Sequence, residues 1–136
     1  MVQSGMNSAT YTACGKAIVL GEHFVVGGGG ALAVALPGIG TTVEVTPSPG
    51  SSGYDLQLQG DFDEGDRALA QRLVERAAEL SGGPPGALVA TRSTVPIGCG
   101  LGSSASFAVA LVGALLRAQG EQPTAALLRE RAHALE

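Results

Sequence analysis

Cysteine is scarce in this chain of 136 residues, which holds only Cys14 and Cys99. Two cysteines are too few for a disulfide framework or a zinc cluster, so a reducing, cytoplasmic location is expected. Long apolar runs are also missing, because glycines and charges interrupt each candidate, and this excludes a membrane-spanning segment. The first residues, Met1 to Thr12, lack a basic stretch followed by an apolar one, so no secretory signal is predicted.

Lysine is rarer still, since Lys16 is the only one and seven arginines supply every other basic side chain. The arginines are scattered and the net charge is −4, which excludes a basic surface for nucleic acid. A GC-rich genome explains a preference for arginine codons. Alternatively, Lys16 is a lysine because a compact ammonium charge is needed at that position. Composition alone leaves both interpretations open.

Apolar residues make up 45% of the chain, which is enough for the core of one domain of ordinary size. Residues 1–10 are expected to form a flexible N-terminus and residues 11–136 the domain. The opening is rich in strands and the rest in helices, which favours an α+β fold with helices on one side of a mostly antiparallel or mixed sheet. Strands are predicted at 11–20, 31–36, 40–46, 54–58 and 87–95, helices at 63–80, 102–119 and 123–136, and a loop at 21–30.

Two of these elements have a clear apolar face. In the 40–46 strand, Thr41, Val43 and Val45 alternate with polar side chains and are expected to face the core. In the 63–80 helix, the predicted apolar stripe consists of Leu69, Leu73, Ala77 and Leu80.

The most informative stretch runs from Pro96 to Ala105 and reads PIGCGLGSSA. Three glycines at alternate positions allow the backbone to take positive φ and to approach a ligand closely. They lead into two serines at the start of an apolar helical pattern, where free N–H groups and the helix dipole attract an anion. The pattern therefore predicts a phosphate-binding loop.

Other known types of glycine-rich loop match this sequence less well. The Walker pattern is excluded because no lysine follows a suitable glycine. A dinucleotide pattern matches at Gly100, Gly102 and Ala105, but the next segment is a helix and not a strand ending in an acidic residue. A simple connecting turn explains one or two glycines, but not three glycines followed by two serines.

The string Pro-x-x-x-Gly-Leu-Gly-Ser-Ser-Ala resembles the nucleotide loop of the GHMP family of small-molecule kinases, named for galactokinase, homoserine kinase, mevalonate kinase and phosphomevalonate kinase. Within that family, the GKAIVLGEHFVV segment at 15–26 and the ALAVAL segment at 31–36 resemble the mevalonate kinases. Galactokinases tend to carry an aspartate after the Gly-Glu-His element, and phosphomevalonate kinases often carry tyrosine in place of His23. The resemblance covers the whole chain in order, although 47–85 carries no signature.

The resemblance implies a fold like the second domain of ribosomal protein S5. The family's catalytic aspartate and its C-terminal domain would follow Glu136, so residues 11–136 are expected to be the N-terminal, ATP-binding part of a longer kinase, incomplete at its C-terminal end. On its own this part is expected to have little activity and to expose apolar surface that the missing domain covers.

The implied reaction is the ATP-dependent phosphorylation of mevalonate to 5-phosphomevalonate in isoprenoid-precursor biosynthesis, with ATP and Mg²⁺ as cofactors. Mevalonate and the C-terminal domain are the implied partners, and the resemblance also allows a homodimer. Two alternatives stay open: another GHMP kinase, acting on phosphomevalonate or homoserine, or a nucleotide-binding relative that has lost catalysis.

The resemblance also assigns residues to roles. Lys16 would lie beside the transferred phosphate as the catalytic cation, Ser104 and Glu136 would hold the magnesium ion, and Glu22 and His23 would lie beside the acceptor. The implied ATP-binding residues are Lys16, Ser93, Pro96, Ile97, Gly98, Cys99, Gly100, Leu101, Gly102, Ser103 and Ser104.

Structural roles compete with three of these assignments. His23 could be a buried histidine bonded to backbone, Ser93 an ordinary strand-end serine, and Glu136 a solvated glutamate at a helix end. The run Gly27–Gly30 replaces larger residues of the family, and four glycines predict a looser loop near the acceptor.

Overall fold

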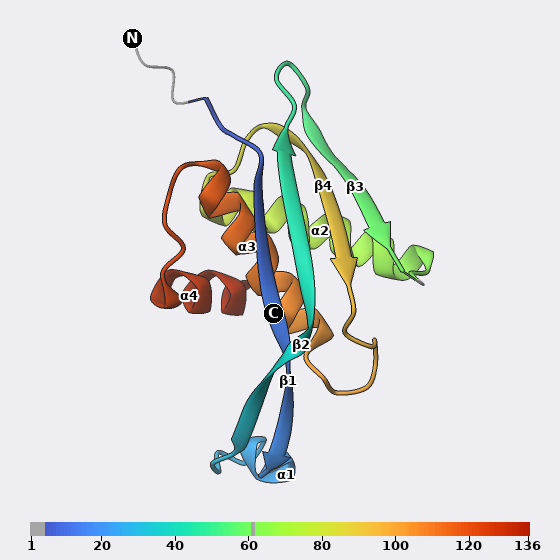
Figure 1. The fold of residues 1–136 in the computed structure, drawn as a ribbon, viewed down its shortest axis with the longest axis vertical. Coiled ribbons are helices and arrows are strands. Elements are labelled where there is room, and N and C mark those ends of the chain that lie inside the picture. The colour runs from blue at the N-terminus through green and yellow to red at the C-terminus, as the bar shows by residue number, and fades with distance from the viewer. Residues whose placement is uncertain (1–4, 61) are drawn as a thin grey trace.

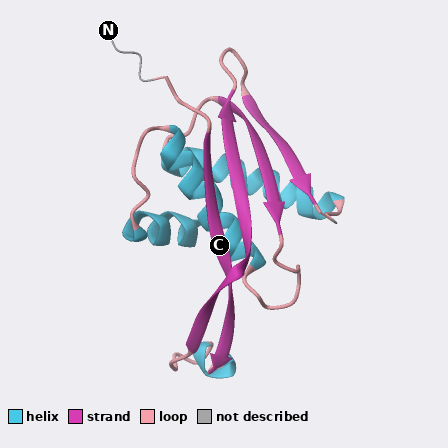
Figure 2. Ribbon diagram, viewed as in Figure 1, coloured by secondary structure: helices cyan, strands magenta, loops and turns pink. Residues whose placement is uncertain are grey.

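One mixed sheet organises residues 5–60 and 62–136, the part of the chain that the computed structural model describes. In the order β1-β2-β4-β3, the first two neighbouring pairs are antiparallel and β3 runs parallel to β4. Helices α2, α3 and α4 lie on one face of this sheet, which confirms the predicted α+β fold (Figures 1 and 2). The strands are β1 (Ala9–Leu20), β2 (Leu32–Pro47), β3 (Gly53–Gln59) and β4 (Gly86–Ser93), and the helices are α1 (Glu22–Val25), α2 (Glu64–Ser81), α3 (Ser103–Ala118) and α4 (Ala125–Leu135).

The core lies between the sheet and α3. Val43 and Val45 of β2 are fully buried, as their alternation with polar residues predicted. Against them packs α3, which is buried on several sides and includes Leu111 and Leu115 at 0% exposure. Burial of these side chains therefore holds α3 against the sheet. It also fixes where the first turn of α3, which follows Gly102, lies relative to the strands.

The β2 strand differs from the prediction, because the segments predicted at 31–36 and 40–46 form one strand. The pairing with β1 passes from Cys14↔Gly40 to Gly15↔Leu36, so residues 37–39 form a bulge. A bulge accommodates Pro37, which has no N–H for the ladder, without ending the strand. The predicted loop at 21–30 likewise contains the single helical turn α1.

The predicted apolar stripe of α2 is also partly wrong. Only Ala77 of the four predicted residues is buried, and Leu69 is 50% exposed. The helix turns its small side chains toward the core, which allows close approach, and it turns Leu69 and Leu73 toward a pocket. The buried residues of α2 are Ala70, Val74, Ala77, Ala78 and Ser81.

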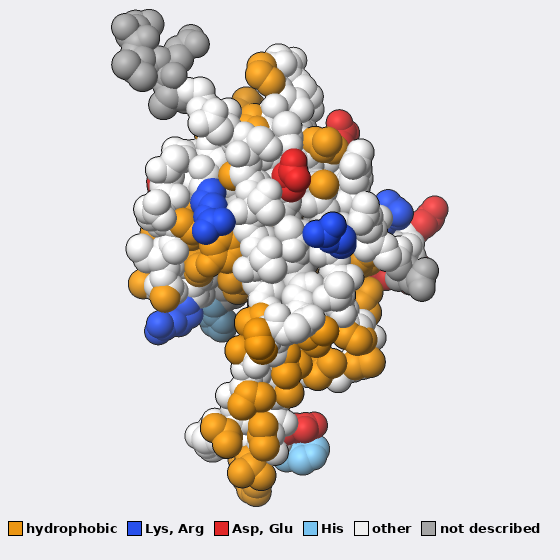
Figure 3. All heavy atoms as spheres, viewed as in Figure 1, with side chains coloured by type: hydrophobic (Ala, Val, Ile, Leu, Met, Phe, Trp, Pro, Cys, Tyr) orange, Lys and Arg blue, Asp and Glu red, His pale blue; other side chains and the backbone are white. Residues whose placement is uncertain are grey.

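The distal halves of β1 and β2, together with α1, extend beyond the helices as an arm made of residues 17–36 (Figure 1). Its apolar side chains gather at the surface (Figure 3), with Phe24 73% and Val26 91% exposed. This agrees with the expectation of exposed apolar surface. None of the helices in the described ranges is both long and apolar enough to cross a bilayer.

Candidate functional site

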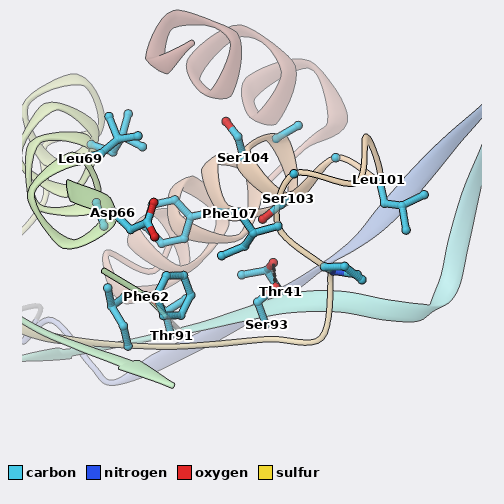
Figure 4. A pocket seen from close by; sticks show the side chains of 18 of the residues that line it. Thr41, Phe62, Asp66, Leu69, Thr91, Ser93, Leu101, Ser103, Ser104 and Phe107 are labelled. Carbon is cyan, nitrogen blue, oxygen red and sulfur yellow. Dashed lines mark hydrogen bonds between the residues drawn. The ribbon is translucent and has the colours of Figure 1, made fainter. Parts of the chain in front are cut away.

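A pocket of about 580 Å³ opens between the glycine-rich loop and the face formed by α2, β3 and β4 (Figure 4). One end is polar and is formed by the loop, by Lys16 and by Glu136. The other end is mainly apolar, and its lining includes Leu58, Phe62, Leu69, Leu73 and Phe107. The pocket thus has a place for an anionic group and, next to it, a place for a flat apolar group.

The loop has the backbone that its glycines allow. Gly98, Gly100 and Gly102 have φ values of 76°, 69° and 77°, in the left-handed region that other residues rarely adopt. The last of them directly precedes α3, whose first-turn N–H groups have no partner within the helix. Together with the helix dipole, these groups make the polar end of the pocket attractive to phosphate.

Lys16 holds this loop against β1. Its backbone N–H donates to the Leu101 carbonyl at 2.9 Å, and its ammonium group donates to the Gly100 carbonyl at 3.3 Å. A Cβ on Gly102 would lie 3.0 Å from Lys16 Cγ, so the lysine stem packs directly on the loop. The only lysine of the chain is thereby fixed at the polar end of the pocket.

Ser104 and Glu136 meet at the same end, where the serine hydroxyl donates to the glutamate Oε1 at 3.3 Å. No group of three or more His, Cys, Asp or Glu side chains in residues 5–60 and 62–136 could hold a metal ion alone. Two adjacent hard oxygens nevertheless fit Mg²⁺, which usually takes one or two protein ligands and completes its shell with water and substrate phosphates.

The apolar end was missed by the sequence analysis. The Thr91 hydroxyl is buried behind this end without a hydrogen-bond partner among the described residues. Asp66 also lines this end, while its carboxylate caps α2 by accepting from the Asp63 N–H at 3.2 Å. No sequence signal marks this wall, because it forms only when the parallel β3–β4 pair and α2 are packed.

The predicted residues are only partly gathered at the pocket. Those that line it are Lys16, Ser93, Pro96, Ile97, Gly98, Gly100, Leu101, Gly102, Ser103, Ser104 and Glu136, whereas Cys99, Glu22 and His23 do not. Glu22 and His23 lie exposed on α1 at the end of the arm. The alternative that His23 is a buried structural histidine is therefore wrong.

Comparison with known proteins independently supports the resemblance to the GHMP kinases. The family model "GHMP kinases N terminal domain" matches residues 68–136. A shikimate kinase from Halobacterium salinarum is 39% identical over 82 residues, covering 60% of this chain and 28% of the relative. A mevalonate kinase from Methanothermobacter thermautotrophicus is 36% identical over 124 residues, covering 89% of this chain and 40% of the relative.

A crystal structure of L. major mevalonate kinase in complex with R-mevalonate has the same fold, with a TM-score of 0.83 at 22% identity. That match covers 93% of this chain and 41% of the solved one. The chain thus spans well under half the length of the proteins it resembles.

Proposed function

The chain belongs to the GHMP kinase family, and from that premise we propose that it forms the nucleotide-binding part of a mevalonate kinase. The reaction is the transfer of a phosphoryl group from ATP to the primary hydroxyl of mevalonate, giving 5-phosphomevalonate for isoprenoid-precursor biosynthesis. The observation that carries the proposal is the packing of Lys16 on the Pro96–Ala105 loop at the polar end of the pocket.

In this proposal the loop and the first turn of α3 bind the phosphates of ATP through backbone N–H groups. The Lys16 ammonium lies beside them and neutralises charge as the phosphoryl group moves, at the edge where the acceptor hydroxyl must approach. The base of the nucleotide occupies the apolar end, between Phe62 and Leu69.

Magnesium belongs to the same proposal. Ser104 and Glu136 would hold the ion, which when bound supplies positive charge across the phosphate oxygens. The two residues themselves orient one another through their hydrogen bond, so the carboxylate is already turned toward the loop before a nucleotide binds.

In this proposal the binding site for mevalonate needs residues beyond those that line the pocket. The relatives are more than twice as long as this chain, and a second domain that follows it would close the site. Glu22 and His23, exposed on the arm, are proposed to contact mevalonate in that closed arrangement. We place the reaction in the cytoplasm, where the exposed thiols of Cys14 and Cys99 would stay reduced.

Two measurements test this function. Calorimetric titration of the chain with ATP and MgCl₂ should show binding, and the variant Lys16→Met should weaken it. A fusion of the chain to the C-terminal part of the Methanothermobacter mevalonate kinase should then be assayed with mevalonate, phosphomevalonate, homoserine and shikimate.

Turnover that is fastest with mevalonate supports the proposal. Shikimate is the second candidate acceptor, because the chain is 39% identical to a shikimate kinase. A preference for shikimate would keep the assignment as a kinase but change the proposed acceptor. ATP binding without turnover of any of the four acceptors would point to a nucleotide-binding relative that has lost catalysis, and absence of ATP binding would contradict the proposal. Mevalonate-dependent turnover by the 136-residue chain alone would contradict the need for a second domain.

A further inference from the structure

A chain of hydrogen bonds between hydroxyl groups passes beneath the glycine-rich loop. Thr41 Oγ1 lies 2.9 Å from Ser93 Oγ and 2.8 Å from Ser106 Oγ. At one end the Val95 N–H donates to Ser93 Oγ at 3.2 Å, and at the other end the Ser106 hydroxyl donates to the Ser103 carbonyl at 2.9 Å.

The two ends decide the direction of every bond between them. A hydroxyl has one proton, and that of Ser106 is committed to the Ser103 carbonyl, so Thr41 must donate to Ser106. The Thr41 proton is then used, so Ser93 must donate to Thr41. Each hydroxyl donates once and accepts once, Ser93 from the Val95 N–H, and such aligned bonds polarise and strengthen one another.

The location of these linked hydroxyl groups indicates their role. Val95 directly precedes the Pro96–Ala105 loop, and Ser103 is the first residue of α3, after the last glycine of the loop, so the linked hydroxyl groups tie together the two sides of the glycine run. Thr41 stands in the middle, on β2, at 1% exposure, and Ser106 is 3% exposed. A buried hydroxyl pair of this kind is costly if either partner is lost, because the other is left unpaired.

We infer that Thr41 is a positioning residue for the phosphate loop, fixing its two ends relative to the sheet so that its N–H groups converge before the ligand arrives. The inference rests on the proposed function only in naming phosphate as that ligand. It also assigns the Ser93 hydroxyl to the loop's support, since its proton is donated to Thr41 and not to a nucleotide.

The decisive variant is Thr41→Val, which keeps the shape of the side chain and removes the hydroxyl. Thr42→Val is the matched control, because Thr42 is the next residue of β2 and its hydroxyl lies 2.9 Å from the Thr12 hydroxyl. It takes no part in the hydrogen bonds that join Ser93, Thr41 and Ser106. Thr41→Ser restores the hydroxyl and should restore the behaviour of the native protein.

Hydrogen exchange of the free protein is the first readout. In Thr41→Val the amides of residues 98–105 should exchange about tenfold faster, the effect of one lost buried hydrogen bond, while those of β3 and α2 keep their rates. Equal loop exchange in Thr41→Val and Thr42→Val would overturn the inference, as would faster exchange spread evenly over the domain. If Thr41→Val does not fold, Ser93→Ala, at the pocket end of the chain, must give the same loop-confined effect or the inference fails.

Ligand affinity is the second readout. Thr41→Val should lower the affinity for ATP about tenfold and leave the affinity for adenosine unchanged, because in the proposed binding mode only the phosphates contact the loop. Equal weakening of both ligands would contradict the inference. If the native protein binds no ATP, the proposed function fails, and the exchange rates alone then decide the role of Thr41.

Discussion

Ser104 and Glu136 lie at opposite ends of two different helices, yet the serine hydroxyl donates to the glutamate carboxylate at 3.3 Å. Ser104 belongs to the first turn of α3, and Glu136 follows the last turn of α4. Helix packing therefore places side by side the two residues that the family resemblance assigns to one magnesium ion. Their contact supports that assignment and shows how to test it.

Glu136→Gln should reduce the gain in ATP affinity that MgCl₂ provides, by about tenfold, since it removes one charged ligand while keeping the shape. Titration calorimetry with and without MgCl₂ measures this gain. Glu130→Gln, an exposed change on the same helix, should leave the gain unaltered. An unchanged magnesium effect in Glu136→Gln would remove Glu136 from the metal site.

Lys16→Met should weaken ATP binding by about tenfold, because a phosphate loses its neighbouring cation in a partly buried site. Lys16→Arg should not restore binding, since a larger planar guanidinium would replace the compact ammonium group that lies 3.3 Å from the Gly100 carbonyl. Adenosine, which has no phosphate, serves as the control ligand and should bind all variants equally. Full ATP affinity in Lys16→Met would exclude Lys16 from the site.

Gly15→Ala should lower the free energy of unfolding by about 1–3 kcal/mol and loosen the loop, because of overpacking. A Cβ at this position would lie 2.9 Å from the Leu101 carbonyl oxygen and 3.3 Å from Ile39 Cδ1. Gly38→Ala is the matched control, since its Cβ would meet nothing within 4 Å. Urea unfolding of both variants measures the difference, and equal midpoints would show that β1 and the loop are not in close contact.

The apolar arm should make the chain associate as its concentration rises, since exposed apolar patches drive association. The double variant Phe24→Ser and Val26→Ser should reduce this effect, because it removes the two most exposed large apolar side chains of the arm. Sedimentation velocity over a range of concentrations measures the change, with Gln57→Ser on β3 as a control. A native chain that stays monomeric throughout would contradict the prediction.

Tyr54 should make the protein less stable at high pH. Burial raises the pKa of its phenol above the ordinary value of 10.0, and its hydroxyl donates to the Pro84 carbonyl. Since the folded state holds this proton more tightly, the stabilisation is complete below pH 10.0 and is lost as the pH rises through the raised pKa.

Tyr54→Phe isolates this effect. It should cost about 1 kcal/mol at neutral pH, because the Pro84 carbonyl loses its donor, and it should flatten the alkaline decline. Urea unfolding of both proteins at neutral pH and above pH 10.0 gives the comparison. An equally steep decline in Tyr54→Phe would assign the alkaline sensitivity to other groups.

Much of the fold follows from local patterns. The alternation of Val43 and Val45 predicted a strand with these two side chains in the core, and the apolar run after Gly102 predicted a helix whose bounds the structure reproduces within a residue. The errors lie where packing overrides pattern. The segments predicted as separate strands at 31–36 and 40–46 form one strand with a bulge, and Leu69 was predicted to face the core where α2 in fact turns that side chain to the pocket.

The sequence by itself determined the chemistry of this protein: a glycine-rich loop that must take positive φ, one lysine, and serines at a helix start. These are local properties, because backbone conformation and side-chain type depend on the residues themselves. Only the tertiary structure decided which groups meet. It packed Lys16 on Gly102, joined Ser104 to Glu136, linked Thr41 to Ser93 and Ser106, and formed the apolar wall around Thr91. Those contacts join residues distant in the chain, and they exist because burying the core against the sheet leaves the elements one arrangement.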